Sequence, residues 1–276
     1  MKRILTAVVL IPLVIAVIYV SPRWPIVLMG ALFVIAALAL WEYLGLADAI
    51  GAKTPKIVVT VLLAVQMAAI FRNPELMAPI SGALALLMLV ICTFRSPLER
   101  VLPDTAFSVF GLLYIGLPLS MMYLLSAQDN GPSLLVFLLF VVWAGDIAAL
   151  YVGRSMGRWT LAKRLSPNKT WEGSIASAVA SIGVAVLLVW LGGTLAARSI
   201  MYLSYPGTYA HWIVLAVLLN IAGQVGDLAE SAIKRAAGAK DSGKLLPGHG
   251  GFLDRIDALL LAAPVLWYAQ LAQQLF

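Results

Sequence analysis

Nine apolar segments, most of them close to 20 residues long, dominate this chain of 276 residues. A helix needs roughly 20 apolar residues to cross the hydrocarbon core of a bilayer, and continuous apolar runs do not fit the alternating strands of an outer-membrane barrel. Because 62% of the residues are hydrophobic and only 12% are charged, a water-soluble globular protein and a disordered chain are both excluded. The sequence therefore predicts an all-α, polytopic helical membrane protein with about nine transmembrane helices. The predicted spans are 4–20, 25–46, 56–71, 76–94, 106–125, 132–152, 172–192, 209–227 and 255–275.

The distribution of Lys and Arg predicts how these helices are oriented. If the amino terminus lies in the cytoplasm, sixteen of the 19 Lys and Arg residues fall in segments on the cytoplasmic side. The other three, Arg23, Arg72 and Arg198, fall outside. This asymmetry follows the positive-inside rule, so we expect an inner-membrane protein with a cytoplasmic amino terminus and an external carboxyl terminus. The net charge of +6 then reflects orientation, and no nucleic-acid partner is expected.

Charged residues divide the chain into two regions. In residues 1–130 the acids lie near span ends or in loops, which indicates a transmembrane scaffold. Residues 131–276 carry acids inside predicted helices and two basic, glycine-rich cytoplasmic loops, 153–171 and 235–253. The single cysteine, Cys92, excludes an internal disulfide and a cysteine-based zinc site. We therefore expect the chemistry of this protein in residues 131–276.

The first polar region includes the first of these loops. Asp146 falls inside an apolar helix, where a carboxylate is costly and usually functional, although it could simply pair with Arg154. The following Ser166, Lys169 and Thr170 could belong to an ordinary loop, with Thr170 as a helix N-cap. Cations beside glycines at a helix start also suit phosphate, which binds backbone N–H groups together with Lys or Arg. This loop is therefore a candidate phosphate-binding site.

The second polar region continues the predicted span at 209–227. Four polar residues at offsets of 0, 3, 4 and 7 share one helix face; they are Asp227, Glu230, Ser231 and Lys234. Arg235 follows directly, so cations and acids alternate along this segment. We expect Lys169, Lys234 and Arg235 to contact substrate phosphates.

The last predicted helix begins with two acids, Asp254 and Asp257, which lie one turn apart. They could be ordinary first-turn acids favoured by the helix dipole, and His249 in the preceding loop could be a structural hydrogen-bonding residue. Gly250 and Gly251, however, offer backbone donors to a phosphate at the helix start. If the loop brings the helix ends together, their carboxylates form a hard-cation site suited to Mg²⁺.

Asp227 and Asp254 are the predicted metal ligands. Neither has a cation on its own helix face that is close enough to neutralise it, because Lys234 lies two turns from Asp227. Carboxylates brought together repel each other, and a divalent ion removes this repulsion while it binds a polyphosphate. Glu230 and Asp257 are expected to orient the two ligands.

One segment of 27 residues resembles the signature of the phosphatidate cytidylyltransferases, which are also called CDP-diacylglycerol synthases. The segment reads Ser231-x-Ile233-Lys234-Arg235-x4-Lys240-Asp241-x-Gly243-x2-Leu246-Pro247-x-His249-Gly250-Gly251-Phe252-x-Asp254-Arg255-Ile256-Asp257. The motifs Ser166-Pro167-x-Lys169-Thr170 and Gly226-Asp227-x-x-Glu230-Ser231 are also similar to that family. The chain departs from the family pattern at one place. A tyrosine is expected four residues after Asp146, but Leu150 stands there and Tyr151 follows, which leaves the role of Tyr151 open.

The resemblance implies a reaction of CTP with phosphatidate (phosphatidic acid) that gives CDP-diacylglycerol and pyrophosphate for phospholipid biosynthesis. It also implies dependence on Mg²⁺, with a second, monovalent cation as an option, a homodimer, and a cytoplasmic site open to membrane lipids. The candidate catalytic residues are then Asp227, Asp254, Lys234 and Arg235, with Asp227 and Asp254 holding the metal. The candidate substrate-binding residues are Asp146, Arg154, Ser166, Lys169, Thr170, Glu230, Ser231, Lys240, His249, Gly250, Gly251, Arg255 and Asp257.

Three other functions remain open from the sequence. A secondary transporter would explain intramembrane acids such as Asp146 and Asp227, but not the basic, glycine-rich loop with paired acids, and no inverted repeat is apparent. A CDP-alcohol phosphotransferase would carry its acids in one compact Asp-Gly…Asp…Asp pattern, which this chain lacks. A purely structural scaffold would not need costly carboxylates in its spans.

Overall fold

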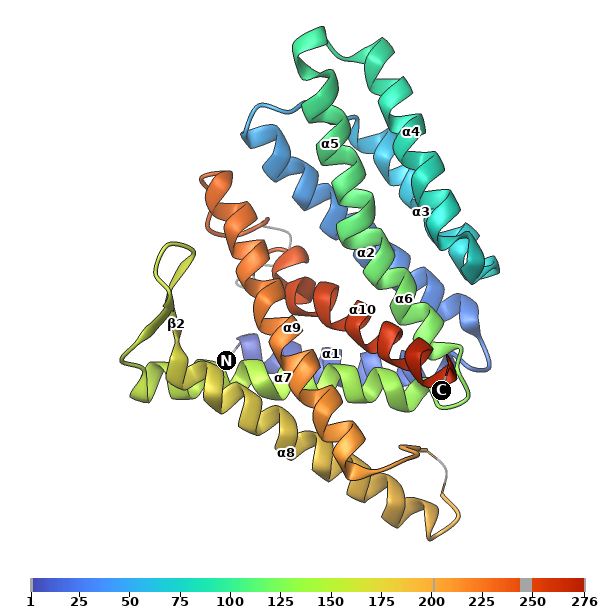
Figure 1. The fold of residues 1–276 in the computed structure, drawn as a ribbon, viewed down its shortest axis with the longest axis vertical. Helices are drawn as coiled ribbons and strands as arrows, with labels where there is room; N and C mark the ends of the chain where they lie inside the picture. The colour runs from blue at the N-terminus through green and yellow to red at the C-terminus, as the bar shows by residue number, and fades with distance from the viewer. Residues whose placement is uncertain (1, 201, 244–249, 276) are drawn as a thin grey trace. The chain divides into compact units, whose positions relative to one another are not determined.

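Helices account for most of the residues that the computed structural model describes, which are 2–200, 202–243 and 250–275 (Figure 1). The chain divides into two compact units. Unit 1 contains Met1–Pro12, Trp24–Leu124 and Ala232–Ile256, and unit 2 contains Leu13–Arg23, Leu125–Ser231 and Asp257–Phe276. Unit 1 therefore combines the predicted scaffold with the segment that connects the last two helices.

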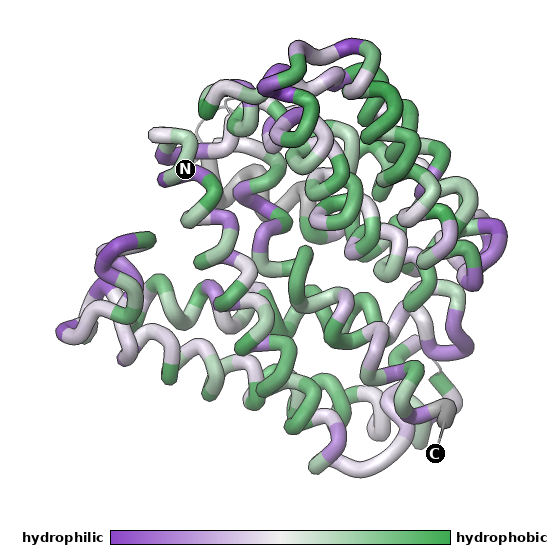
Figure 2. Tube along the Cα trace, turned by 45° about the horizontal axis from the view of Figure 1, so that its top comes forward, coloured by the Kyte–Doolittle hydropathy of each residue, from purple (hydrophilic) through white to green (hydrophobic). Residues whose placement is uncertain are grey.

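Each predicted apolar segment coincides with helical structure. The elements are α1 (Lys2–Val20), α2 (Pro25–Ala49), α3 (Lys56–Arg72), η1 (Pro74–Leu76), α4 (Met77–Arg95), η2 (Leu98–Arg100), α5 (Val101–Gly111), η3 (Leu112–Gly116), α6 (Leu117–Ser126), α7 (Gly131–Met156), β1 (Thr160–Ala162), β2 (Ser166–Thr170), α8 (Trp171–Ala196), α9 (Tyr209–Ala236) and α10 (Leu253–Leu275). Figure 2 shows that hydrophobic residues line the helices, whereas hydrophilic residues gather in the β1–β2 hairpin and the connecting loops. This is the pattern of a chain whose helices are solvated by lipid.

The all-α membrane fold is confirmed by the length and composition of these helices. Among the described residues, seven helical segments are long and apolar enough to cross a membrane. They are 25–49, 74–95, 98–126, 131–156, 171–196, 209–236 and 253–273. Helix α3, with 17 residues, is shorter than these seven segments. The count of nine spans and the sides of the two termini therefore stay predictions.

Small residues set the helix packing in unit 1. A Cβ atom on Gly111 would lie 2.7 Å from the Leu40 side chain, so α5 approaches α2 closely and a larger residue here would force that side chain to shift. At the predicted cytoplasmic end, the buried Asp104 accepts hydrogen bonds from the Lys53 backbone N–H at 2.8 Å and from the Ser96 hydroxyl at 2.6 Å. These bonds fasten the loops after α2 and α4 to the start of α5.

Helices α7 and α8 form the close pair of unit 2 and lie side by side along most of their length (Figure 1). A Cβ atom on Gly145 of α7 would lie 2.7 Å from the Ser177 hydroxyl and 2.8 Å from the Ser181 hydroxyl of α8. A Cβ atom on Gly173 would lie 2.9 Å from the carbonyl oxygen of Ala149. Such a seam of small residues is typical of helix contacts in membranes, where backbones must approach closely to gain packing energy.

A β-hairpin connects these two helices, where the sequence predicts a loop. Strands β1 and β2 are antiparallel, with Thr160 opposite Thr170 and Ala162 opposite Ser166, and the register shifts between these pairs. The Trp171 N–H donates to the Trp159 carbonyl oxygen at 2.9 Å and closes the hairpin at the start of α8. The candidate phosphate-binding residues of this segment are therefore held on a strand with a defined geometry.

Candidate active site

An ion pair between Lys169 and Asp227 is the centre of the polar cluster in unit 2. The Lys169 Nζ on β2 lies 2.6 Å from the Asp227 Oδ2 on α9, and 24% and 37% of the two side chains are exposed. Asp146 on α7 lies close enough for its charge to interact with both residues. One cation and two carboxylates, from three different elements, thus gather at one place in this unit.

Thr170 fixes the position of Lys169, because it ends the hairpin and begins α8. Its Oγ1 accepts a hydrogen bond from the Gly173 N–H at 3.2 Å, which confirms the predicted N-cap. A Cβ atom on Gly157, at the end of α7, would lie 2.6 Å from the Thr170 methyl group. The glycine at this position therefore allows the capping residue to pack directly against the end of α7.

A ladder of uncharged polar side chains joins α9 to α8 below this ion pair. Ser174 donates to the Gln224 Oε1 at 2.5 Å, and Gln224 donates to the Asn220 Oδ1 at 2.6 Å. The Asn220 amide donates to the hydroxyls of Ser177 at 2.7 Å and Ser181 at 3.0 Å. Hydrogen bonds between helices in a low-dielectric interior are a recurrent means of holding membrane helices together. Asn220 and Gln224 lie seven and three residues before Asp227, so this ladder fixes the helix face that carries the aspartate.

Helix α9 also packs tightly against the first turns of α10 within unit 2. A Cβ atom on Gly226 would lie 2.6 Å from the Asp257 carbonyl oxygen and 3.3 Å from the Ala258 Cα. Glycine at 226 thus permits a backbone contact directly before Asp227. Glu230, one turn further along α9, is fully buried, and its role in orienting the ligands stays a prediction.

Asp254 is the centre of a second polar cluster, which lies in unit 1. Its Oδ1 lies 2.6 Å from the Lys234 Nζ, and both side chains are largely buried. Its Oδ2 accepts hydrogen bonds from the backbone N–H and hydroxyl of Ser242, both at 3.0 Å, and from the Gly251 N–H at 2.7 Å. Gly250 has a φ of 79°, a left-handed conformation that favours glycine. The carboxylate at the start of α10 therefore organises the loop residues on both sides of 244–249.

Glu42, which the sequence did not single out as a site residue, belongs to this second cluster. The Glu42 Oε2 on α2 accepts hydrogen bonds from the Ser242 hydroxyl and the Leu253 N–H, both at 3.0 Å. Its Oε1 is buried and has no hydrogen-bond partner among the described residues. A Cβ atom on Gly243 or Gly251 would overlap the Glu42 carboxylate, so both glycines of the loop make room for it. The sequence signal that could have identified Glu42 as a functional residue is a carboxylate inside an apolar helix.

Each predicted metal ligand has a lysine partner in the structure. Neither lysine lies on the same helix as its aspartate, in agreement with the sequence analysis. The inference that the two carboxylates are left unpaired is wrong, because the lysines come from other elements, β2 and α9. Within the part of the chain that the structure describes, no group of three or more His, Cys, Asp or Glu residues is arranged to hold a metal ion. The two-acid metal centre stays a prediction.

The other predicted residues lie at the ends of these elements. Ser166 begins β2, and Ser231 lies half-buried on α9. Arg235 is exposed and donates to the Ala239 carbonyl oxygen at 3.2 Å. Three other predicted site residues are exposed cations: Arg154 at the end of α7, Lys240 in the loop after α9 and Arg255 in the first turn of α10. His249 lies outside the described residues.

Comparison with known proteins gives matches along the whole chain. Residues 1–272 match the model of a family described as the Cytidylyltransferase family. The chain is 48% identical over 158 residues to a phosphatidate cytidylyltransferase of Brucella suis biovar 1, covering 57% of this chain and 54% of that protein. It is 36% identical over 165 residues to a phosphatidate cytidylyltransferase of Staphylococcus saprophyticus, covering 59% and 58%. With the protein of the same name from Synechocystis, the identity is 32% over 290 residues, covering 92% and 93%. The matches to Brucella and Staphylococcus thus span only a little over half the length of those relatives.

Proposed function

Because this chain belongs to the cytidylyltransferase family, we propose that it transfers the cytidylyl group of CTP to phosphatidate, forming CDP-diacylglycerol and pyrophosphate. The relatives named phosphatidate cytidylyltransferase support this substrate pair. The observation that carries the proposal is the pairing of Lys169 with Asp227 beside Asp146. The lysine can bind a phosphate, and the carboxylates beside it can bind the metal ion that accompanies that phosphate.

In this reaction an oxygen of the lipid phosphate forms a bond to the α-phosphorus of CTP. The bond from that phosphorus to the oxygen that bridges it to the β-phosphate breaks, and pyrophosphate leaves. The lipid phosphate is already anionic near neutral pH, so a strong general base is not needed. The main difficulty is the repulsion between two polyanions, which Lys169, Lys234 and Arg235 would offset in the ground state and the transition state.

We propose that Asp227 and Asp254 hold Mg²⁺. Carboxylate oxygens are the donors that this ion prefers, and the exposed part of the Asp227 side chain leaves it accessible to an ion. Within unit 2, the glycine at 226 brings the backbone directly before Asp227 against the backbone of Asp257. When bound, Mg²⁺ would neutralise nucleotide phosphates and stabilise the departing pyrophosphate. Substrate phosphates would give Lys169 and Lys234 new anionic partners, which would leave the two aspartates to the ion.

We also propose that the site faces the cytoplasm from the inner membrane and that the enzyme is a homodimer. CTP is a cytosolic, water-soluble nucleotide and phosphatidate is a membrane lipid, so a site for both must lie at the cytoplasmic interface. The concentration of cations in the predicted cytoplasmic segments supports this orientation. Light scattering of the purified protein in detergent would give its mass, and a mass of one chain would contradict the dimer.

The test of the proposed reaction is an assay of purified protein in detergent with CTP, Mg²⁺ and phosphatidate. We expect release of pyrophosphate in equal amounts to the CDP-diacylglycerol formed, and no release when phosphatidate is omitted. The variant Asp129→Asn, which alters an exposed acid in the loop before α7, serves as a control and should retain activity. Absence of turnover in the wild-type protein would refute the proposal and is the result that a transporter would give.

A further inference from the structure

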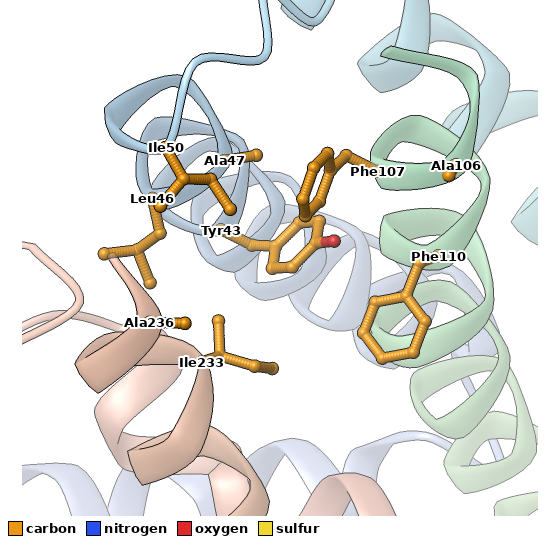
Figure 3. Close-up of a pocket in the computed structure, with 9 residues that line it drawn as sticks. All are labelled: Tyr43, Leu46, Ala47, Ile50, Ala106, Phe107, Phe110, Ile233 and Ala236. Atoms are coloured by element: carbon orange, nitrogen blue, oxygen red, sulfur yellow. The ribbon is translucent and has the colours of Figure 1, made fainter. Parts of the chain in front are cut away.

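An apolar pocket opens between three helices of unit 1 (Figure 3). Its volume is about 370 Å³, which falls at the lower end of the range of 300–1,000 Å³ typical of small-molecule sites. Tyr43, Leu46 and Ala47 of α2 form a buried floor, and Phe110 of α5 and Ile50 are partly exposed at its edge. The phenol oxygen of Tyr43 is the only polar side-chain atom among the residues that line it.

Aromatic contacts give this pocket a defined shape. The rings of Tyr43 and Phe110 have centroids 5.9 Å apart, and Phe110 stacks on Tyr114 at 5.3 Å. The close approach of α5 to α2 at Gly111, where a Cβ atom would lie 3.1 Å from the Tyr43 ring, holds these side chains in place. These contacts fix the wall that α2 and α5 give to the pocket.

The pocket lies beside the cationic end of α9. Ile233 and Ala236 line it from the last turn of α9, and Lys234 and Arg235 stand between them in the chain. The other lining residues belong to the end of α2 and the first part of α5. At a rise of 1.5 Å per residue, those on α5 lie within roughly 14 Å of the start of that helix. These helix ends are the ones that the charge distribution places on the cytoplasmic side. An apolar cavity at this depth, lined by a helix whose last turn also carries two cations, is complementary to a lipid with an anionic headgroup.

We propose that this pocket holds one acyl chain of the phosphatidate substrate, with the lipid phosphate directed toward the cationic end of α9. This inference rests on the proposed function. A nucleotide does not suit the pocket, because its base and sugar would lose hydrogen bonds to water against a lining with a single hydroxyl. Apolar burial would instead contribute to substrate binding in proportion to the methylene groups that enter.

The experiment compares two tryptophan substitutions. Ala106 lies at the pocket and is exposed, so Ala106→Trp adds an indole at the mouth without overpacking the core. Ala83, an exposed alanine of α4 in the same unit that does not line the pocket, gives the matched control Ala83→Trp. The KM values for CTP and for two phosphatidates are measured in detergent, one with two 18-carbon chains and one with two four-carbon chains.

We expect Ala106→Trp to raise the KM for the long-chain phosphatidate about tenfold, which corresponds to about two methylene groups left unburied. The KM for the short-chain phosphatidate and for CTP should stay as in the wild type, and Ala83→Trp should change none of them. An unchanged KM for the long-chain lipid, or an equal rise for both lipids, would overturn the acyl-chain assignment.

A second measurement separates the substrate from a structural lipid. Phosphatidate and phosphatidylglycerol with identical long chains are added to the protein without CTP, and the increase in the thermal unfolding temperature is recorded. We expect the increase from phosphatidate to be lost in Ala106→Trp and kept in Ala83→Trp. The contrary result is that phosphatidylglycerol raises the unfolding temperature as much as phosphatidate does, with both increases lost in Ala106→Trp. That result would assign the pocket to bulk lipid and overturn the proposal. This readout does not need turnover, so failure of the proposed reaction would be recognised separately by an inactive wild-type protein.

Discussion

Replacing Glu42 tests whether a residue of the amino-terminal scaffold positions Asp254. The Glu42 carboxylate accepts from the Leu253 N–H and shares the single Ser242 hydroxyl proton with Asp254, and the Ser242 backbone N–H donates to Asp254. We expect Glu42→Ala to lower both the thermal unfolding temperature and kcat, because it releases the loop and the helix start that fix the Asp254 carboxylate.

The hydrogen bonds give the size of this effect. Ser242 can direct its hydroxyl to the Asp254 Oδ2, also 3.0 Å away, so Leu253 N–H is the donor that loses its partner. A buried donor without a partner costs about 1–3 kcal/mol, and the cavity left by truncation adds to that cost. Glu42→Gln keeps an acceptor oxygen and loses only the charge assistance, which costs about 1 kcal/mol. A displacement of Asp254 by about 1 Å would lower kcat by about 10²-fold.

The assay measures the unfolding temperature and kcat for pyrophosphate release, with Glu99→Ala, an exposed acid of the same unit, as control. A second test uses Gly243, where a methyl group would overlap the Glu42 carboxylate. Gly243→Ala should destabilise the wild type and cost much less in the Glu42→Ala background, as a double-mutant cycle would reveal. If Glu42→Ala kept wild-type stability and kcat, the positioning role would be refuted. A lower stability with an unchanged kcat would restrict Glu42 to the fold.

Three further outcomes are expected. Lys169→Ala should raise the KM for CTP and phosphatidate while changing the free energy of unfolding by no more than about 1 kcal/mol, the value of a partly exposed ion pair; unchanged kinetics for both substrates would remove Lys169 from the site. Gln224→Leu should lower stability by about 1–3 kcal/mol by breaking the ladder between α8 and α9, and it should lower kcat through Asp227, whereas the exposed Val225→Leu should do neither. A reporter fused to the carboxyl terminus should indicate the external side, and a cytoplasmic signal would mean that the span count is wrong by one.

The helices could be predicted because each depends on a local run of apolar residues. The predicted span at 209–227 extends to Ala236 in the structure, since the polar residues from Asp227 onward keep helical spacing and so continue the helix beyond the apolar part. The Thr170 cap was predictable for the same reason, because a cap is a local signal. The β1–β2 hairpin was not, because its strands have three and five residues and lack the alternation that marks a strand.

The partners of the charged residues could not be predicted, because they depend on contacts between distant parts of the chain. Glu42 and Ser242 are 200 residues apart in sequence, and no spacing rule relates them. The lysine partners of the two aspartates likewise come from other elements. Asn220 and Gln224 could have been recognised in the sequence, because they share a helix face with Asp227 at offsets of seven and three. This signal is weaker than that of the charged residues, because amides in an apolar helix carry no charge.

A titration of turnover with Mg²⁺ tests the central claim most directly, namely that Asp227 and Asp254 together form the metal centre of a cytidylyltransferase. Initial rates of pyrophosphate release are measured for the wild type and for Asp227→Asn, Asp254→Asn, Glu230→Gln and Asp257→Asn. Asn is nearly isosteric with Asp and removes one charge. We predict no turnover at any Mg²⁺ concentration for the first two variants and reduced, Mg²⁺-dependent turnover for the other two. Thermal unfolding measurements should show that all four variants are folded. Near wild-type turnover of Asp227→Asn or Asp254→Asn at saturating Mg²⁺ would contradict the two-acid centre and would move the metal site to Asp146.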